Sequence, residues 1–475
     1  MSKYLTKPAP IETMPSGIPY IVGNEAAERF SFYGMKTILV VFMTKYLMDS
    51  MGNPQFFTET EAREGMGWFV ASAYFFPVLG AILADAILGK YLTILLLSIV
   101  YCLGHLALAL IDLPSAALQA TFEPRTFLLL GLILIAVGSG GIKPCVSANV
   151  GDQFGPRNKH LISKVFGWFY FSINFGSFFS TLLTPYLLAN YGPGWAFGVP
   201  GILMGIATLI FWLGRYKFVH IQPRGWAYLR ETFTGDGLRT ILKLIPIYIF
   251  VAVFWSLYDQ SGSAWVLQAD KMDRNFLGVN WLESQIQAVN PLLILIFIPL
   301  FSYVVYPVIN KVFPLTPIRK ISIGFFVTVA AFGISGLIET WITQGLTPNI
   351  VWQILAYVLL TAAEVMVSIT CLEFSYTQAP PQMKSLIMSL YLLSVSAGNA
   401  FTALVNRFTM DEKGNSTLEG ADYYWFFTVF MAVAAVVFIV VGYFYRPHEY
   451  IQGDEPEGPE AEHLAQATLG RTDDR

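Results

Sequence analysis

The chain has 475 residues, of which 55% are hydrophobic and 13% are charged, about half the charged fraction of an average soluble domain. This composition excludes a soluble globular protein, because the resulting surface would be too apolar for water. The net charge of -3 and the scattered lysines and arginines argue against a nucleic-acid partner.

Twelve apolar runs follow one another, each long enough to cross a hydrocarbon core of roughly 30 Å as a helix. An even number of spans places both termini on one side, and the loops on that side hold most of the Lys and Arg residues. The positive-inside rule therefore predicts a multi-pass membrane protein with both termini in the cytoplasm. We expect it in the cell inner (plasma) membrane. The runs lie at 17–48, 65–88, 91–111, 126–147, 162–190, 194–216, 237–265, 283–313, 320–345, 349–378, 383–409 and 423–445.

The longest and most basic connection on the cytoplasmic side, residues 220–236, divides the spans into six and six. The sequence therefore predicts an all-α membrane protein whose twelve transmembrane helices form two six-helix bundles, residues 17–219 and 237–446. Residues 1–16 form a cytoplasmic segment before the first bundle. Residues 447–475 are acidic with few apolar side chains, and we expect a disordered tail there.

The three cysteines, Cys102, Cys145 and Cys371, lie inside apolar runs and lack the paired spacing of a metal site or disulfide framework. We expect them to pack as small hydrophobic side chains. Neither a metal nor a cofactor is expected. The N-terminal residues lack the pattern of a removable signal peptide.

The first span carries a polar stripe made of Glu25, Glu28, Arg29, Tyr33 and Lys36. At 100° per residue these side chains fall within an arc of about 140° on a helix. A charge at membrane depth costs about 2.5 to 3.5 kcal/mol on insertion scales, so these charges need partners or a water-filled cavity. The stripe indicates a functional face, and a structural ladder of ion pairs is the alternative.

Lys143 in the fourth span lies about as deep from the cytoplasmic side as Glu28 does in the first span. Equal depth predicts a Glu28–Lys143 ion pair. The preceding glycines, Gly138, Gly140 and Gly141, would let another helix or a ligand approach closely, although small residues also serve ordinary helix packing.

In the second half, Glu364 lies near the middle of the tenth span, where a lone carboxylate is a candidate for binding a proton or an ammonium group. Glu373 would fall on the opposite helix face, where a structural role suits it better. Asn290, Trp255 and Asp259 add polar groups that hydrocarbon would not tolerate. Asp259 lies toward the outer end of its span, so simple solvation is an equal alternative for it.

The distribution of these charges suits a zwitterion. Cations lie in the first half, and a lone carboxylate lies in the second. A peptide carboxylate would lie toward Arg29 and Lys143, and its ammonium toward Glu364 and the amide oxygen of Asn290. Possible aromatic walls of such a pocket are Tyr33, Tyr74, Trp255 and Tyr391.

Residues 25–34 (EAAERFSFYG) resemble the ExxERFxYYG signature of the proton-dependent oligopeptide transporter family. The resemblance implies the major facilitator fold, with two six-helix bundles around a central site, and the carriage of dipeptides and tripeptides together with protons. Further matches lie at 80–90 (GAILADAILGK), 138–154 (GSGGIKPCVSANVGDQF), 169–177 (FYFSINFGS) and 373–385 (EFSYTQAPPQMKS), and 254–269 (FWSLYDQSGSAWVLQA) is similar to the animal branch.

By position, the resemblance assigns the substrate carboxylate to Arg29 and Lys143 and the substrate amino group to Asn290 and Glu364. It further implies pocket residues Tyr33, Tyr74, Asn174 and Trp255, and proton-linked carboxylates Glu25 and Glu28. Asp259 and Glu364 are the next candidates for proton coupling on their positions in the spans. Two departures stand out: Gly67 replaces a histidine that the animal branch uses in proton coupling, and Tyr391 replaces a usual pocket tryptophan. The implied partners are dipeptides, tripeptides, protons and the lipid bilayer, and we expect a monomer.

Alternating access is the expected mechanism, with proton uptake at Glu28 favoured when a peptide carboxylate takes its cationic partners. An intramembrane protease is one alternative, suggested by Tyr258 next to Asp259, but the sequence has no Gly-x-Gly-Asp and no His-Glu-x-x-His. A channel would need rings of like groups. A family-related carrier of nitrate or another small anion would leave Glu364 without an ammonium partner. An enzyme is therefore not expected.

Overall fold

The computed structural model describes residues 4–112, 123–223, 225, 235–378, 384–411 and 416–445. The expected disorder of the tail after residue 446 lies outside these residues, as does most of the expected connection between the bundles.

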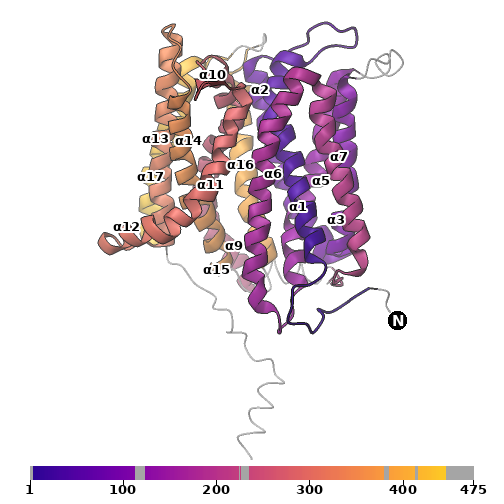
Figure 1. Cartoon of the computed structure of the whole chain (residues 1–475). Coiled ribbons are helices and arrows are strands. Elements are labelled where there is room, and N and C mark those ends of the chain that lie inside the picture. The colour runs from indigo at the N-terminus through magenta and orange to yellow at the C-terminus, as the bar shows by residue number, and fades with distance from the viewer. Residues whose placement is uncertain are drawn as a thin grey trace, which may run out of the picture.

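Helices account for most of the described chain (Figure 1). The first half contains α1 (Ile18–Val41), α2 (Glu59–Ile82), α3 (Lys90–Ala109), α5 (Pro124–Asp152), α6 (Ile162–Tyr191) and α7 (Pro193–Leu213). The second half contains α9 (Gly235–Tyr258), α10 (Ala264–Asp270), α11 (Val289–Leu300), α12 (Tyr306–Val312), α13 (Pro317–Thr343), α14 (Val351–Glu364), α15 (Thr370–Gln378), α16 (Lys384–Thr409) and α17 (Gly420–Phe444).

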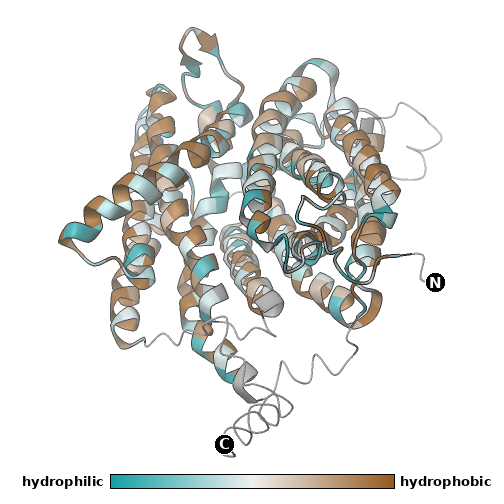
Figure 2. Ribbon diagram, turned by 60° about the horizontal axis from the view of Figure 1, so that its bottom comes forward, coloured by the Kyte–Doolittle hydropathy of each residue, from teal (hydrophilic) through white to brown (hydrophobic). Residues whose placement is uncertain are grey.

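Ten helical spans among the described residues are long and apolar enough to cross a membrane. The long helices α1 and α6 complete the expected twelve spans. The helices of the first half pack around one hydrophobic core, which includes Tyr101 and Phe197, and most helices of the second half pack around another, which includes Trp265 and Phe332. Figure 2 shows the two groups side by side, with hydrophobic residues along the helices of both. The expected fold class, two bundles of the major facilitator type, is confirmed.

The molecule has two ends, which we call the terminal face and the distal face. The terminal face is where α1 begins and α17 ends, and the distal face carries α10 and a short hairpin (Figure 1). In the hairpin, β1 (Asn275–Phe276) pairs antiparallel with β2 (Val279–Asn280). The backbone N–H of Asn275 and the side-chain amide of Asn349 lower the pKa of the Asp273 carboxyl just before β1.

Two local features position the site. Gly80 of α2 and Gly141 of α5 lie so close that a Cβ atom on Gly80 would come within 2.3 Å of the Gly141 carbonyl oxygen. Gly141 therefore serves helix packing. In the second half, a π-helical turn, η9 (Val365–Ile369), directly follows Glu364 and separates α14 from α15. Such turns interrupt regular helices at functional sites, and apolar periodicity does not reveal them.

Candidate substrate site between the bundles

A cavity of about 290 Å³ lies between the two groups of helices. Its wall is drawn from α1, α2 and α6 in the first half and from α9, α11, α14 and α16 in the second. Sequence-predicted residues on this wall are Tyr33, Lys36, Tyr74, Asn174, Trp255, Asp259, Asn290, Glu364 and Tyr391. The structure therefore brings nine separately predicted side chains to one cavity, with aromatic rings and polar groups facing the same space.

The carboxylate of Glu364 is the most distinctive group on the second-half wall. The side-chain amide of Asn290 donates a hydrogen bond of 2.8 Å to Glu364 Oε2, and a second one of 3.1 Å to Thr361 Oγ1. The amide nitrogen of Asn290 is thus committed within the protein. What this pair can offer a ligand is oxygen, from the carboxylate and from the Asn290 amide, which suits an ammonium group.

Asp259 pairs across the interface between the two halves. Its Oδ1 lies 2.6 Å from Lys36 Nζ, and its Oδ2 accepts a hydrogen bond of 2.8 Å from Asn399 of α16. Both side chains of the ion pair are largely buried. The alternative that Asp259 is simply solvated is wrong, because its carboxylate is shared between a cation of α1 and an amide of α16.

Glu25, Glu28 and Arg29 of the polar stripe form a compact buried cluster, whereas Tyr33 and Lys36 of the same stripe line the cavity. Arg29 Nε lies 2.6 Å from Glu25 Oε1 and 3.0 Å from Glu28 Oε2. Ser139 of α5 donates a hydrogen bond of 2.8 Å to Glu28 Oε1. Within the described residues, neither Arg29 nor the two glutamates belong to the cavity wall. Sequence reasoning missed Ser139, which is a lone hydroxyl in a glycine-rich run.

The expected Glu28–Lys143 pair is wrong. Lys143 Nζ is buried, has no hydrogen-bond partner among the described residues, and lies 4.1 Å from the ring centroid of Phe32 and 4.0 Å from that of Tyr74. Glu28 is already occupied by Arg29 and Ser139, so the lysine takes the faces of two aromatic rings instead. Tyr74 also lines the cavity, so one ring contacts both the cavity and the lysine.

Gly67, the position where a histidine was expected by resemblance, is a contact point between α2 and α16. A Cβ atom there would lie 3.0 Å from Ala403 Cβ and 3.1 Å from the Asn399 carbonyl oxygen. An imidazole would not fit without separating these two helices. Gly67 thus lets α2 and α16 approach each other closely at this point.

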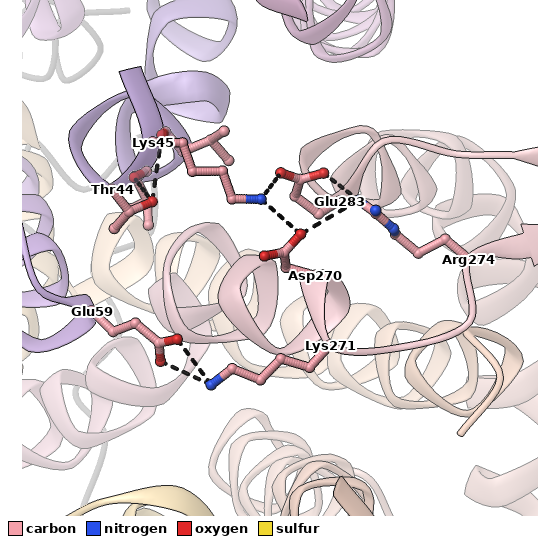
Figure 3. A network of polar contacts seen from close by, with 9 residues as sticks. Thr44, Lys45, Glu59, Asp270, Lys271, Arg274 and Glu283 are labelled. Atoms are coloured by element: carbon pink, nitrogen blue, oxygen red, sulfur yellow. Dashed lines mark hydrogen bonds and ion pairs between the residues drawn. The ribbon is translucent and has the colours of Figure 1, made fainter. Parts of the chain in front are cut away.

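A second set of ion pairs joins the two halves at the distal face (Figure 3). Lys45 Nζ lies 2.7 Å from Asp270 Oδ1 and 2.8 Å from Glu283 Oε1, and Glu283 also pairs with Arg274. Lys271 pairs separately with Glu59 of α2 at 2.9 Å. The Lys36–Asp259 pair also joins the two halves. We call the contacts of Lys45 and Lys271 the distal lock.

We predict that Lys45→Gln opens the distal side more often. Lys45 and Asp270 are partly exposed, so loss of the two Lys45 ion pairs is expected to cost about 1 kcal/mol, which corresponds to about a fivefold change in the population of the open form. The measurement is the rate at which a membrane-impermeant maleimide, added at the distal side, labels Ser261→Cys in the cavity wall. Lys90→Gln is the control, because it breaks the Lys90–Asp152 pair inside the first half. Equal labelling rates in both variants would contradict the lock.

No cluster of His, Cys, Asp and Glu side chains in the described part of the chain could hold a metal ion.

Twelve spans around a polar cavity, divided between two helical halves, define a multi-pass membrane protein of the major facilitator class. The sequence profile of the POT family matches residues 91–235 and 226–426. The chain belongs to the POT family.

Relatives and solved structures agree with this assignment. The chain is 36% identical over 377 residues to peptide transporter family 1 of Drosophila melanogaster, and this alignment covers 71% of this chain and 49% of the relative. It is 36% identical over 383 residues to solute carrier family 15 member 2 of Homo sapiens, which covers 71% of this chain and 51% of that protein. The chain thus spans about half the length of the curated relatives it matches. The crystal structure of the POT family transporter PepTSo superimposes with a TM-score of 0.80 at 35% identity, covering 91% of this chain and 99% of PepTSo.

Proposed function

We propose that this protein is a proton-coupled symporter of dipeptides and tripeptides that works by alternating access. The observation that carries the proposal is the polarity of the central site. The Glu364–Asn290 pair on one wall presents oxygen acceptors, and the cations of Arg29 and Lys143 lie behind the opposite wall. This arrangement supports binding of a zwitterionic substrate. A small anion such as nitrate has no ammonium group that could bind Glu364.

In the proposed site, the peptide ammonium binds Glu364 and the amide oxygen of Asn290. Its carboxylate draws Lys143 away from the rings of Phe32 and Tyr74, with Arg29 contributing from α1. The side chains of Tyr33, Asn174 and Trp255 complete the pocket, and the amide nitrogen of Asn174 already donates to the Tyr170 carbonyl oxygen at 2.9 Å.

Proton coupling is proposed to occur in the buried cluster of α1. A peptide carboxylate that engages Arg29 competes with Glu28 for the guanidinium, and Glu28 then takes up a proton. Thermodynamic reciprocity requires that proton binding strengthens peptide binding in turn. Glu25 keeps Arg29 paired meanwhile, and Asp259 and Glu364 are further candidates for proton binding. Opening of the distal side requires that the distal lock and the Lys36–Asp259 pair break.

The proposal includes the arrangement in the membrane. Two bundles, residues 17–219 and 237–446, rock against each other in the cell inner membrane, joined by the cytoplasmic connection 220–236. Both termini lie in the cytoplasm, and the protein acts as a monomer without a cofactor or nucleic acid. The distal face is then the outer face.

The test uses purified protein reconstituted into liposomes. Uptake of a labelled dipeptide should rise above its equilibrium level only with an inward proton gradient. Unlabelled dipeptides and tripeptides should compete, whereas a dipeptide with both termini blocked, or nitrate, should not. Accumulation without a proton gradient, or competition by nitrate, would exclude the proposed function.

A further inference from the structure

A second groove, of about 520 Å³, lies on the second bundle near the terminal face. It is formed where α11 passes through a π-helical turn, η8 (Phe301–Val305), into α12. Figure 1 shows α12 projecting sideways from the body of the molecule. In the most apolar stretch of the span Glu283–Val312, 11% of the residues are buried, whereas 33% to 56% are buried in the corresponding stretches of the other candidate spans. The groove therefore lies beside a helix that is poorly covered by the protein itself.

The helix surface beside this groove carries large exposed side chains, as expected of a surface that faces lipid. Tyr303 is 82% exposed and Val312 is 89% exposed, and Val308 between them is also exposed. Large apolar side chains on a membrane-spanning element are covered by lipid when the protein does not cover them. The occupant that reaches the groove from this side is thus a lipid.

The chemistry of the groove is amphipathic and carries one charge of each sign. Ile298 and Val365 supply an apolar wall, and Lys320 and Glu373 supply the charges. Lys320 Nζ lies 4.4 Å from the ring centroid of Tyr306, and the Glu373 side chain is exposed. Within the described residues, neither Lys320 nor Glu373 takes part in an ion pair. A ligand with a phosphate and an ammonium would satisfy both groups.

We propose that this groove binds the phosphoethanolamine headgroup of a membrane phospholipid. Lys320 binds the phosphate, Glu373 accepts hydrogen bonds from the primary ammonium, and the acyl chains follow the apolar wall toward the bilayer. A choline headgroup has a quaternary ammonium without N–H donors, and a glycerol headgroup has no cation. Both therefore leave Glu373 without a charge-assisted hydrogen bond.

The headgroup site touches the central cavity through one residue. Ile369, at the end of the π-helical turn η9, lines both the groove and the cavity. Glu364 directly precedes the same turn. A lipid in the groove thus packs against the segment that carries the proposed ammonium-binding carboxylate. The headgroup site itself does not depend on the proposed function.

The test measures bound lipid directly, without transport. Purified protein is equilibrated with phosphatidylethanolamine, phosphatidylcholine and phosphatidylglycerol of identical acyl chains, and retained lipid is counted by native mass spectrometry. We expect about tenfold preference for phosphatidylethanolamine over either competitor, since a hydrogen bond to a charged group contributes that much. Glu373→Gln should reduce this preference to within about twofold, while Lys320→Gln should weaken retention of all three lipids.

Lys243→Gln is the matched control, because Lys243 is an exposed cation on α9 that does not line the groove. Its lipid preference should equal that of the unaltered protein, and the midpoint of heat denaturation in detergent checks that each variant is folded. Equal retention of the three lipids by the unaltered protein would overturn the proposal. So would an unchanged preference in folded Glu373→Gln.

Discussion

Glu28→Gln is expected to reduce proton-driven accumulation of a dipeptide by up to about 100-fold, while counterflow exchange stays within a few fold. Glutamine keeps the shape of the side chain and can still accept the 2.8 Å hydrogen bond from Ser139. It cannot bind a proton at membrane depth as the carboxylate can. Proton-driven uptake measures the coupled process, and exchange of labelled for unlabelled peptide without a gradient measures peptide movement alone.

The single substitution is preferable to replacing both glutamates of the cluster. Glu25 remains 2.6 Å from Arg29 in the single variant, so the buried guanidinium keeps a carboxylate partner. Removing both would leave a buried charge uncompensated, at a cost of about 3 to 5 kcal/mol, and could unfold the protein. Ser139→Ala serves as the control, since it removes the hydrogen bond and leaves both carboxylates. Equal loss of both activities in folded Glu28→Gln would assign Glu28 to a structural ladder instead.

Glu364→Gln is expected to weaken binding of a free dipeptide by about 10-fold to 100-fold and to leave binding of its N-acetylated form unchanged. The ammonium loses its charged acceptor, whereas the acetylated terminus never used it. The measurement is inhibition of labelled peptide exchange by each compound. Glu339→Gln is a suitable control, because Glu339 is a buried carboxylate of the same half that does not line the central cavity. The same discrimination in both variants would rule out the ammonium-binding role.

Helical periodicity and membrane depth, both read from the sequence, predicted much of the site. They did not predict which side chains pair with each other. Spacing along α1 placed its charges on one face, and Glu25, Glu28 and Arg29 do form a buried cluster, while Lys36 pairs with Asp259 of the second half. Depth placed Lys143 near the first helix, and Lys143 does contact Phe32 of that helix. Depth carries no information about competing acceptors, however. Ser139 and Arg29 occupy Glu28, so the lysine is left to the aromatic rings.

The ion pairs between the halves could not be predicted from the sequence for a different reason. Lys45 follows α1, whereas Asp270 and Glu283 flank a hairpin about half the chain length away. Short apolar helices and loops give no periodic signal that would align such charges. Gly67 shows the same limit, because its role depends on how closely α16 approaches α2.

The ion pairs between the halves differ in their access to water. The Lys45 and Asp270 side chains of the distal lock are 39% and 34% exposed, whereas Lys36 and Asp259 are 13% and 8% exposed. At physiological ionic strength the Debye length is about 8 Å, and dissolved ions screen exposed charges much more than buried ones. Raising the salt concentration on the distal side should therefore loosen the outer contacts and spare the inner pair. Salt on the distal side thus acts on the more exposed contacts of the distal lock, while the buried Lys36–Asp259 pair keeps its strength.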